Sequence, residues 1–271
     1  NLMGIDACQE LMPNVNHVAV FDTAFHQSME ASNFLYALPY EVYEKYRVRR
    51  YGFHGTSHFY VSHRAAEMLG KPFEECKIIT LHLGNGASMA AIKGGKVVDT
   101  TMGFTPLEGL VMGTRSGDID PAIVFFLMEK LGLSTTEANS YFNKKSGMLG
   151  LSVVSNDLRD ILEAAASGNQ RAQTALDVYY NRVKGYIGNY MAKLNGCDCL
   201  VFTAGVGENA IDIRENICKD LDYLGIKMDV EKNKVRGKEV DVAAADSKVK
   251  IFVIPTNEEL VIARDTYRLS K

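Results

Sequence analysis

The stretch KIITLHLGNGASMAAIKGGKVVDTTMGFTPLEGLVMGTRSGDIDP, residues 77–121, decides the fold. Two strand-like runs, Lys77–Leu83 and Ser88–Ile92, flank Gly84-Asn85-Gly86. Asn-Gly between such runs predicts a β-hairpin, because a tight turn needs residues that accept a positive φ. A second turn, at Gly94-Gly95, leads into a third predicted strand, Lys96–Thr101. The sequence therefore predicts three consecutive strands joined by hairpin turns.

The segment after these strands is a loop rich in Gly, Thr and Ser that carries a single cation, Arg115. It ends at Asp118-Ile119-Asp120-Pro121, which predicts a helix start with an Asp cap and Pro at the first helical position. Glycine lets a backbone approach phosphate closely, and a guanidinium grips phosphate with a planar fork of donors. We expect this stretch to hold a phosphate chain.

Length and composition narrow the function classes. A chain of 271 residues with 46% hydrophobic and 23% charged residues is typical of a soluble globular protein of one large domain or two modest ones. A net charge of −3 argues against a general nucleic-acid binder. No apolar run is long enough to span a bilayer, so we expect no membrane partner.

The five cysteines indicate reduced thiols and a cytoplasmic location. Cys197-Asp198-Cys199 has no second Cys/His pair to complete a zinc site. The chain begins at Asn1 with neither Met nor a signal-peptide pattern, and we expect it to start in the middle of a longer protein.

Upstream of the hairpins, His17–Phe21 predicts a buried strand that delivers Asp22 at its carboxyl end. Residues at such ends tend to face ligands, although Asp22 capping a turn fits the sequence equally well. Further on, two glycines around His54 expose this side chain on a tight backbone, with a structural role as the alternative. His58 follows in a predicted helix and is assigned to its surface or to a local hydrogen bond.

Downstream, helical patterns alternate with short breaks. Gly147–Leu151 predicts a turn, and Ser155 or Asn156 is expected to cap a helix that places Asp157 in its first turn. A long helix over Asn169–Leu194 carries an apolar stripe that predicts core or a subunit interface.

A strand over Cys199–Thr203 runs into a glycine loop that opens a helix, and this arrangement favours anion binding. Gly205, Gly207 and Ala210 also match the dinucleotide pattern G-x-G-x-x-A, with Asp229 as the ribose-binding acid. That alternative is an oxidoreductase, but the β-hairpins have no place in a Rossmann domain.

The chain closes with a strand over Val249–Ile254 and a terminal helix. Thr256 and Glu259 predict a capping box for that helix. Glu258 then has no structural task and lies just past a strand end.

This order of elements resembles one half of the sugar-kinase/actin superfamily. The residue sequences of five motifs are more specific than this order of elements, and they resemble the acetate kinase family over essentially the whole chain. The motifs are Phe21-Asp22-Thr23-Ala24-Phe25-His26, Gly52-Phe53-His54-Gly55-Thr56-Ser57-His58, Leu81-His82-Leu83-Gly84-Asn85-Gly86, Thr105 through Asp118, and Phe202-Thr203-Ala204-Gly205-Val206-Gly207-Glu208-Asn209.

The resemblance implies an α/β protein of the actin-like, ribonuclease H-like fold, with a mixed sheet flanked by helices. Family members begin with a strand of phosphate-contacting Asn and Ser and supply a second Arg and another His, which have no match here. We therefore expect residues 1–23 to be the remnant of a truncated first domain, residues 24–257 a largely complete second domain, and residues 258–271 a helix that packs back on the first. A homodimer through the second domain is also implied, and we expect the chain alone to be inactive.

The implied activity is reversible, in-line phosphoryl transfer from ATP to acetate, giving acetyl phosphate and ADP within acetyl-CoA biosynthesis. By the resemblance, Arg115, His54 and Asp22 are catalytic. Asp22 and Glu258 would hold Mg²⁺, with Mn²⁺ as a substitute. Phe53 and Pro106, with Arg115, would form the acetate pocket.

The resemblance also implies a nucleotide site on the hairpin turn, the glycine loop and the helix start near Asp157. Its residues would be His82, Leu83, Gly84, Asn85, Gly86, Asp157, Leu158, Arg159, Gly205, Val206, Gly207, Glu208 and Asn209. The alternatives are a propionate or butyrate kinase of the same family and a non-enzymatic actin-like nucleotide-binding module.

Overall fold

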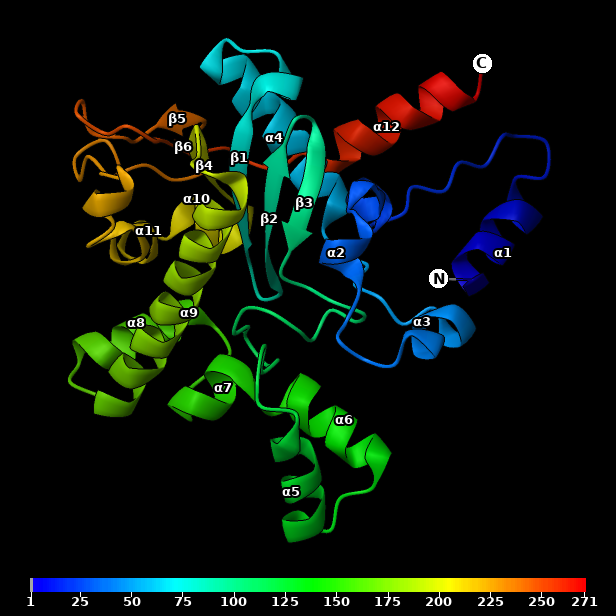
Figure 1. Cartoon of the computed structure of the whole chain (residues 1–271), viewed down its shortest axis with the longest axis horizontal. Helices are drawn as coiled ribbons and strands as arrows, with labels where there is room; N and C mark the ends of the chain where they lie inside the picture. Colours follow the sequence, from blue (N-terminus) through cyan, green and yellow to red (C-terminus); the bar gives the residue numbers. More distant parts are fainter. Residues whose placement is uncertain (1) are drawn as a thin grey trace.

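The predicted hairpin strands form one side of a six-stranded mixed sheet (Figure 1). The computed structural model describes residues 2–271. In sheet order the strands are β3 (Lys96–Thr100), β2 (Ala87–Lys93), β1 (Lys77–Leu83), β4 (Cys199–Thr203), β6 (Lys250–Val253) and β5 (Val240–Asp241).

Strand directions follow from the connections. The β1–β2 and β2–β3 pairs are antiparallel hairpins, whereas β4 and β6 enter by helical crossovers and run parallel to β1. Leu83 pairs with Ala87, so residues 84–86 form the first turn. The carboxyl ends of β1 and β4 therefore meet at one edge of the sheet, next to that turn.

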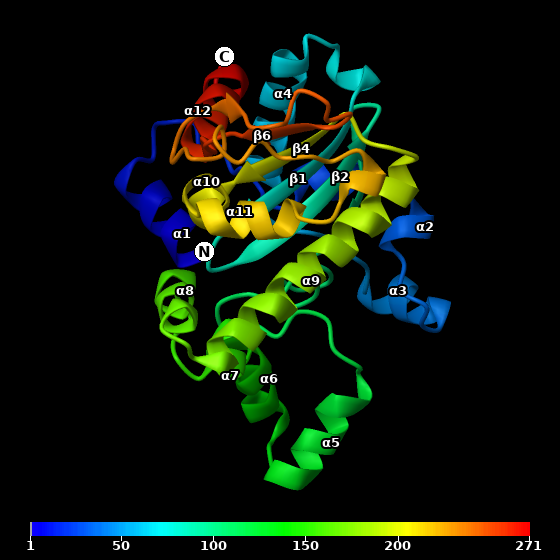
Figure 2. The same ribbon diagram turned by 90° about the vertical axis from the view of Figure 1, so that its left-hand side faces the viewer.

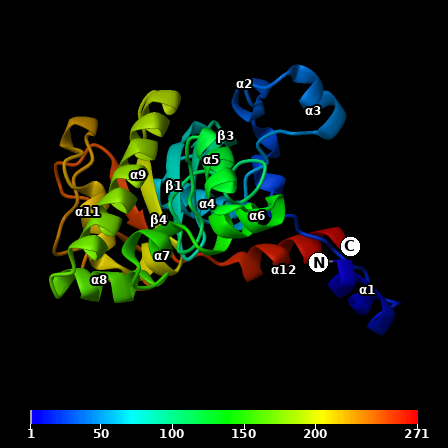
Figure 3. The same cartoon turned by 90° about the horizontal axis from the view of Figure 1, so that it is seen from below.

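Helices cover both faces of the sheet (Figures 1 and 3). On one face, α9 (Gln170–Leu194) contacts the three hairpin strands, and α11 (Ile211–Cys218) packs beside it. On the other face, α4 (Gly55–Leu69) contacts β1 and β4. Alternation along β1 serves both layers, because Ile79 and Leu81 join the core under α9 while Ile78 joins the core under α4.

Four helices between β3 and α9 extend away from the sheet (Figure 2). They are α5 (Ala122–Leu131), α6 (Thr135–Lys144), α7 (Gly147–Ser152) and α8 (Leu158–Ala166). Asp120 Oδ1 accepts from Ala122 N–H at the start of α5 at 2.9 Å, and a capping box from Ser134 and Glu137 opens α6. The Asp120 bond agrees with the predicted Asp cap, but Pro121 is the N-cap and not the first helical residue, which is Ala122.

The two ends of the chain lie on the same side of the molecule in Figure 1. Here α1 (Leu2–Leu11) has no buried residue, and α12 (Glu258–Leu269) buries only Val261. The 3-10 helix η1 (Ala24–Ser28) and the short helices α2 (Ala31–Phe34) and α3 (Tyr40–Tyr46) connect this side to α4.

Several local predictions were wrong. His17–Phe21 forms no strand and is mostly exposed, because no neighbouring strand covers this short apolar run. Residues 147–152 form helix α7 in place of a turn. His58 is fully buried, because Thr80 and Ser88 of the sheet provide hydrogen-bond partners for both of its ring nitrogens.

Two helix caps also differ from the predicted ones. Asp157 itself caps α8 by accepting from Arg159 N–H, and Asn257 caps α12 by accepting from Leu260 N–H. The glycine loop after β4 is already helical, as α10 (Ala204–Asn209), and a break at Ala210 separates it from α11. Within residues 2–271, no helix is long and apolar enough to cross a membrane.

Candidate active site

The hairpin turn brings Arg115 and His54 to one point. A Cβ placed on Gly86 would lie 2.8 Å from Arg115 Nη2 and 3.6 Å from His54 Nε2. Arg115 Nη1 donates to the Pro106 carbonyl at 2.7 Å, which fixes the guanidinium across the turn. Half-burial lowers the pKa of Arg115, but an arginine stays charged at neutral pH. A guanidinium and an imidazole nitrogen that flank a bare glycine suit a bound anion.

The imidazole of His54 is held from behind by a buried hydrogen-bond chain. Its Nδ1 lies 2.8 Å from Ser88 Oγ, which also contacts His58 Nε2 at 2.8 Å. His58 Nδ1 in turn lies 2.7 Å from Thr80 Oγ1 on β1. Burial lowers the pKa of both His54 and His58, so each ring is neutral at pH 7.

His82 supports the same ring from its flat side. The two imidazoles of His54 and His82 stack with centroids 4.0 Å apart, and His82 Nδ1 lies 2.8 Å from Ser57 Oγ. Burial lowers the pKa of His82 to about 3, so this ring is also neutral. His82 therefore lies against the face of the His54 ring.

The loop that carries Arg115 is anchored by partly buried charged side chains. Arg50 donates to the carbonyls of Thr100 and Thr101 and to Glu108 Oε1. Tyr186 Oη donates to Asp118 Oδ2 at 2.5 Å, and Asp118 Oδ1 accepts from Gly109 N–H. These bonds tie the loop to β3 and to α9, so the guanidinium is presented by a fixed backbone.

Asp22 and Glu258 form an acidic pair near His54. Asp22 Oδ2 accepts from His54 N–H at 2.7 Å. Burial, and then the negative charge of Asp22, raise the pKa of Glu258. Such a pair favours a bound cation, and Mg²⁺ prefers few carboxylates completed by water and phosphate oxygens. No cluster of three or more His, Cys, Asp or Glu that could hold a metal occurs in residues 2–271. The two carboxylates thus fit an Mg²⁺ site in which substrate and water supply the other ligands.

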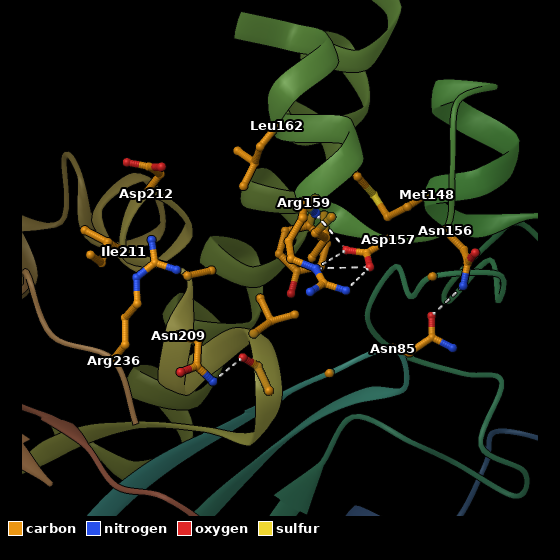
Figure 4. Close-up of a pocket in the computed structure, with 17 residues that line it drawn as sticks. Asn85, Met148, Asn156, Asp157, Arg159, Leu162, Asn209, Ile211, Asp212 and Arg236 are labelled. Carbon is orange, nitrogen blue, oxygen red and sulfur yellow. Dashed lines mark hydrogen bonds and ion pairs between the residues drawn. The ribbon is translucent and has the colours of Figure 1, made fainter. Parts of the chain in front are cut away.

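A pocket of about 770 Å³ opens beside the hairpin turn, between α8, α10 and α11 (Figure 4). Its size is that of a nucleotide-type ligand site. It is lined by Gly84, Asn85, Gly113, Met148, Asn156, Asp157, Leu158, Arg159, Leu162, Tyr179, Gly205, Val206, Asn209, Ala210, Ile211, Asp212 and Arg236. The wall toward the sheet is polar and glycine-rich, whereas Met148, Leu158 and Leu162 make an apolar end.

Eight of the predicted nucleotide residues line this pocket: Gly84, Asn85, Asp157, Leu158, Arg159, Gly205, Val206 and Asn209. The other five lie outside the lining. Gly86 faces Arg115, His82 stacks on His54, and Leu83 is buried in the core. The Gly207 carbonyl accepts from buried Arg214, and Glu208 Oε1 accepts from Thr256 N–H at 3.1 Å.

Of the predicted acetate-pocket residues, Pro106 contacts Arg115. The contact is the hydrogen bond to its carbonyl, and Phe53 precedes His54 in the chain. Phe53 is half-buried and packs against the core, whereas Pro106 is exposed. Asp229, the acid of the dinucleotide alternative, instead accepts from the N–H groups of Glu231 and Lys232 and does not line the pocket.

Some lining residues escaped the sequence prediction. Asn156 donates to Asn85 Oδ1 at 3.2 Å and closes the pocket across the hairpin turn, and Arg236 approaches from a loop near Ile211 (Figure 4). Arg236 sits in a polar segment with no periodic pattern, so nothing local marks it. Asn156 directly precedes Asp157 in the sequence, and this position next to a predicted nucleotide residue could have identified it.

A mixed sheet in this order, with a glycine-rich turn and a helix start facing a nucleotide-sized pocket, defines the actin-like, sugar-kinase class of fold. The family model described as the Acetokinase family matches residues 1–264. The chain belongs to this family.

Known members align over nearly all of the chain. An acetate kinase of Syntrophomonas wolfei is 86% identical over 271 residues, which are 100% of this chain and 68% of that protein. An acetate kinase of Acetivibrio thermocellus is 61% identical with the same coverage. The crystal structure of Porphyromonas gingivalis acetate kinase superimposes with a TM-score of 0.96 at 51% identity, covering 100% of this chain and 68% of that one. A propionate kinase from Francisella tularensis gives a TM-score of 0.93 at 46% identity, covering 98% and 68%.

Proposed function

We propose that this chain carries the phosphoryl-transfer site of an acetate kinase, which converts ATP and acetate reversibly into ADP and acetyl phosphate. The observation that carries the proposal is the convergence of Arg115 Nη2 and His54 Nε2 on Gly86, on the same hairpin turn that lines the 770 Å³ pocket. Family membership and the names of the high-identity relatives support the choice of acetate as acceptor.

Arg115 and His54 act on the transferring group. Phosphoryl transfer needs alignment and charge neutralisation more than covalent help from the protein. The Arg115 guanidinium suits the equatorial oxygens, which gain charge in the transition state. His54 is neutral, so its Nε2 contributes a hydrogen bond without a proton transfer. Acetate is already ionised, so no general base is needed to activate it.

ATP occupies the pocket beside the turn. Gly84 and Asn85 of the turn and the start of α10 line this pocket, and we expect the phosphates there because helix starts favour anions. The apolar end near Leu158 and Leu162 suits the adenine ring. Asp22 and Glu258 would hold Mg²⁺, which neutralises phosphate charge when bound; Mn²⁺ would substitute.

The acyl chain is selected beside Arg115. Phe53 and Pro106 would wall the methyl group of acetate. One extra methylene is worth only about 1–3 kcal/mol in an apolar pocket, so propionate is the second candidate substrate. The close match to a protein described as a propionate kinase favours this alternative over butyrate.

Domain organisation and assembly are part of the proposal. The exposure of α1 and α12 supports the assignment of residues 1–23 and 258–271 to the neighbourhood of a first actin-like domain, with residues 24–257 as the second. On that basis residues 1–271 alone would bind nucleotide without turning over acetate. The exposed Phe125 and Phe126 of α5 support a homodimer through the second domain. Free cysteines support a cytoplasmic location.

The test measures nucleotide binding and turnover separately. Calorimetry of residues 1–271 with ADP, ATP and NAD should show binding of the adenine nucleotides in preference to NAD. Acetyl phosphate formation, trapped as the hydroxamate, should be measured in a longer form of the protein with acetate, propionate and butyrate. Adenine nucleotide binding without phosphorylation of any of the three acids would refute the enzyme proposal and leave the actin-like binding module.

A further inference from the structure

One peptide unit at the site is held at both ends by side chains from a single turn. The Phe53 carbonyl lies 2.9 Å from His26 Nε2, and the next N–H, that of His54, donates to Asp22 Oδ2 at 2.7 Å. Asp22 and His26 are four residues apart, at η1 and just before it. Because each bond uses a different end of the same peptide, the two side chains together fix its plane.

The role of His26 in this contact is settled by chemistry. A carbonyl accepts only, so His26 Nε2 must carry the proton and donate. His26 is fully buried, and burial lowers its pKa to about 4, so the ring is neutral. Its Nδ1 is buried without a hydrogen-bond partner. A ring kept only for packing would not leave a buried polar nitrogen unpaired, because that carries a cost in free energy. The Nε2–H donor is therefore the feature that distinguishes His26 from a phenylalanine.

The clamped peptide leads into a strained residue. His54 has φ of 56°, in the left-handed region that side-chain-bearing residues rarely adopt. Gly52, two residues earlier, has φ of 76°, and a Cβ there would lie 2.6 Å from His26 Cδ2. The His26 ring thus fills the space under the segment and supports it through both packing and the hydrogen bond. These contacts add to the bond from His54 N–H to Asp22 and to the contact of His54 Nδ1 with Ser88.

We propose that His26 is a positioning residue, which through the Phe53–His54 peptide sets the direction of the His54 imidazole and its spacing from Asp22. Its importance for turnover rests on the proposed function, whereas the clamp itself does not. The shared turn couples the carboxylate to the imidazole, so a shift of one moves the other. Removing the His26 donor should loosen His54 without touching Arg115 or the nucleotide pocket.

The test compares His26→Phe with His26→Gln. Phenylalanine keeps the ring and loses the donor, whereas the Gln side-chain nitrogen lies the same number of bonds from Cβ as Nε2 and restores it. His63→Phe is the matched control, because His63 Nδ1 also contacts a backbone carbonyl, that of Phe59, from helix α4. Native-state hydrogen exchange of residues 1–271 is measured for the His54 amide and for Ile79 in β1.

In His26→Phe the His54 amide should exchange about fivefold to tenfold faster, as expected for one lost hydrogen bond, with Ile79 unchanged. His26→Gln should restore protection, and His63→Phe should leave it unaffected. Equal acceleration at Ile79 would indicate general destabilisation and overturn the proposal, as would an unchanged His54 amide. In a form that turns over acetate, His26→Phe should lower kcat up to about 100-fold with KM for ATP within about twofold. Absence of acetate kinase activity in the wild type would refute the proposed function alone, because the exchange readout does not depend on it.

Discussion

Gly86→Ala is the smallest change that should separate catalysis from folding. Gly86 does not have a positive φ, so its backbone accepts an alanine. The new Cβ would lie 2.8 Å from Arg115 Nη2. An ordinary contact is about 3.5 Å, so the guanidinium must retreat by about 0.7 Å. The displaced atom is at the end of a flexible side chain, and the free energy of unfolding should fall by no more than about 1 kcal/mol.

Catalysis should respond much more strongly than stability. Misplacement of a catalytic group by 1 Å costs about 100-fold in rate, so a retreat of this size should lower kcat by between about tenfold and 100-fold. The assay is acetyl phosphate formation at saturating ATP, beside a urea denaturation curve. Gly188→Ala in α9 is the control, because a Cβ there meets nothing within 4 Å. Near-normal kcat in Gly86→Ala would refute the convergence of Arg115 and His54 on this point.

Three further predictions follow from the site. Arg115→Ala should lower kcat by several orders of magnitude while ATP affinity changes by no more than a few-fold. Arg115→Lys should restore turnover only in part, because lysine lacks the planar fork of donors. Near-normal turnover of both variants in steady-state kinetics would contradict the assignment. Asn85→Ala and Gly205→Val should weaken ADP binding far more than acetate binding, and calorimetry that shows unchanged ADP affinity in both would place the nucleotide elsewhere. Acid should destabilise the chain, because His26 takes up a proton at about 6.5 when unfolded and only at about 4 when folded. The contribution of neutral His26 to the free energy of unfolding is fully present above pH 6.5 and is lost as the pH falls toward 4. It amounts to roughly 3 kcal/mol. Equal free energies of unfolding from urea curves at pH 7 and pH 4.5 would contradict this prediction.

Local chemistry explains which parts of the fold the sequence predicted. The two hairpins formed at the predicted turns, residues 84–86 and Gly94-Gly95. Gly94 and Gly95 have the positive φ that the glycine pattern predicts, whereas residues 84–86 turn without one. The long helix α9 agreed with its apolar stripe over almost the whole predicted range. Both signals lie within one element, so no knowledge of the tertiary structure was needed.

The incorrect predictions concern features that depend on residues far away in the chain. The apolar run His17–Phe21 has strand composition, but a strand needs a partner, and none lies beside it among residues 2–271. His58 looked like a surface residue of α4, yet Thr80 and Ser88 satisfy both of its ring nitrogens from the sheet. Arg236 lines the pocket from a loop that buried Arg214 holds by donating to the carbonyls of Asn233 and Val235. Each outcome depends on a partner far away in the chain.

Backbone strain at the site also depends on distant partners, and the sequence predicted only a tight backbone at His54. His54 and Ala204 both have positive φ, 56° and 63°, and they stand at the starts of α4 and α10 on either side of the hairpin turn. Each costs on the order of 1–3 kcal/mol, which the surrounding packing must offset. His54 Nε2 lies near Arg115 Nη2 across Gly86, and Gly205 and Val206 in the first turn of α10 line the pocket. Two strained helix starts thus flank one hairpin turn, and on the His54 side the contacts of Asp22 and Ser88, with the proposed support from His26, offset the strain.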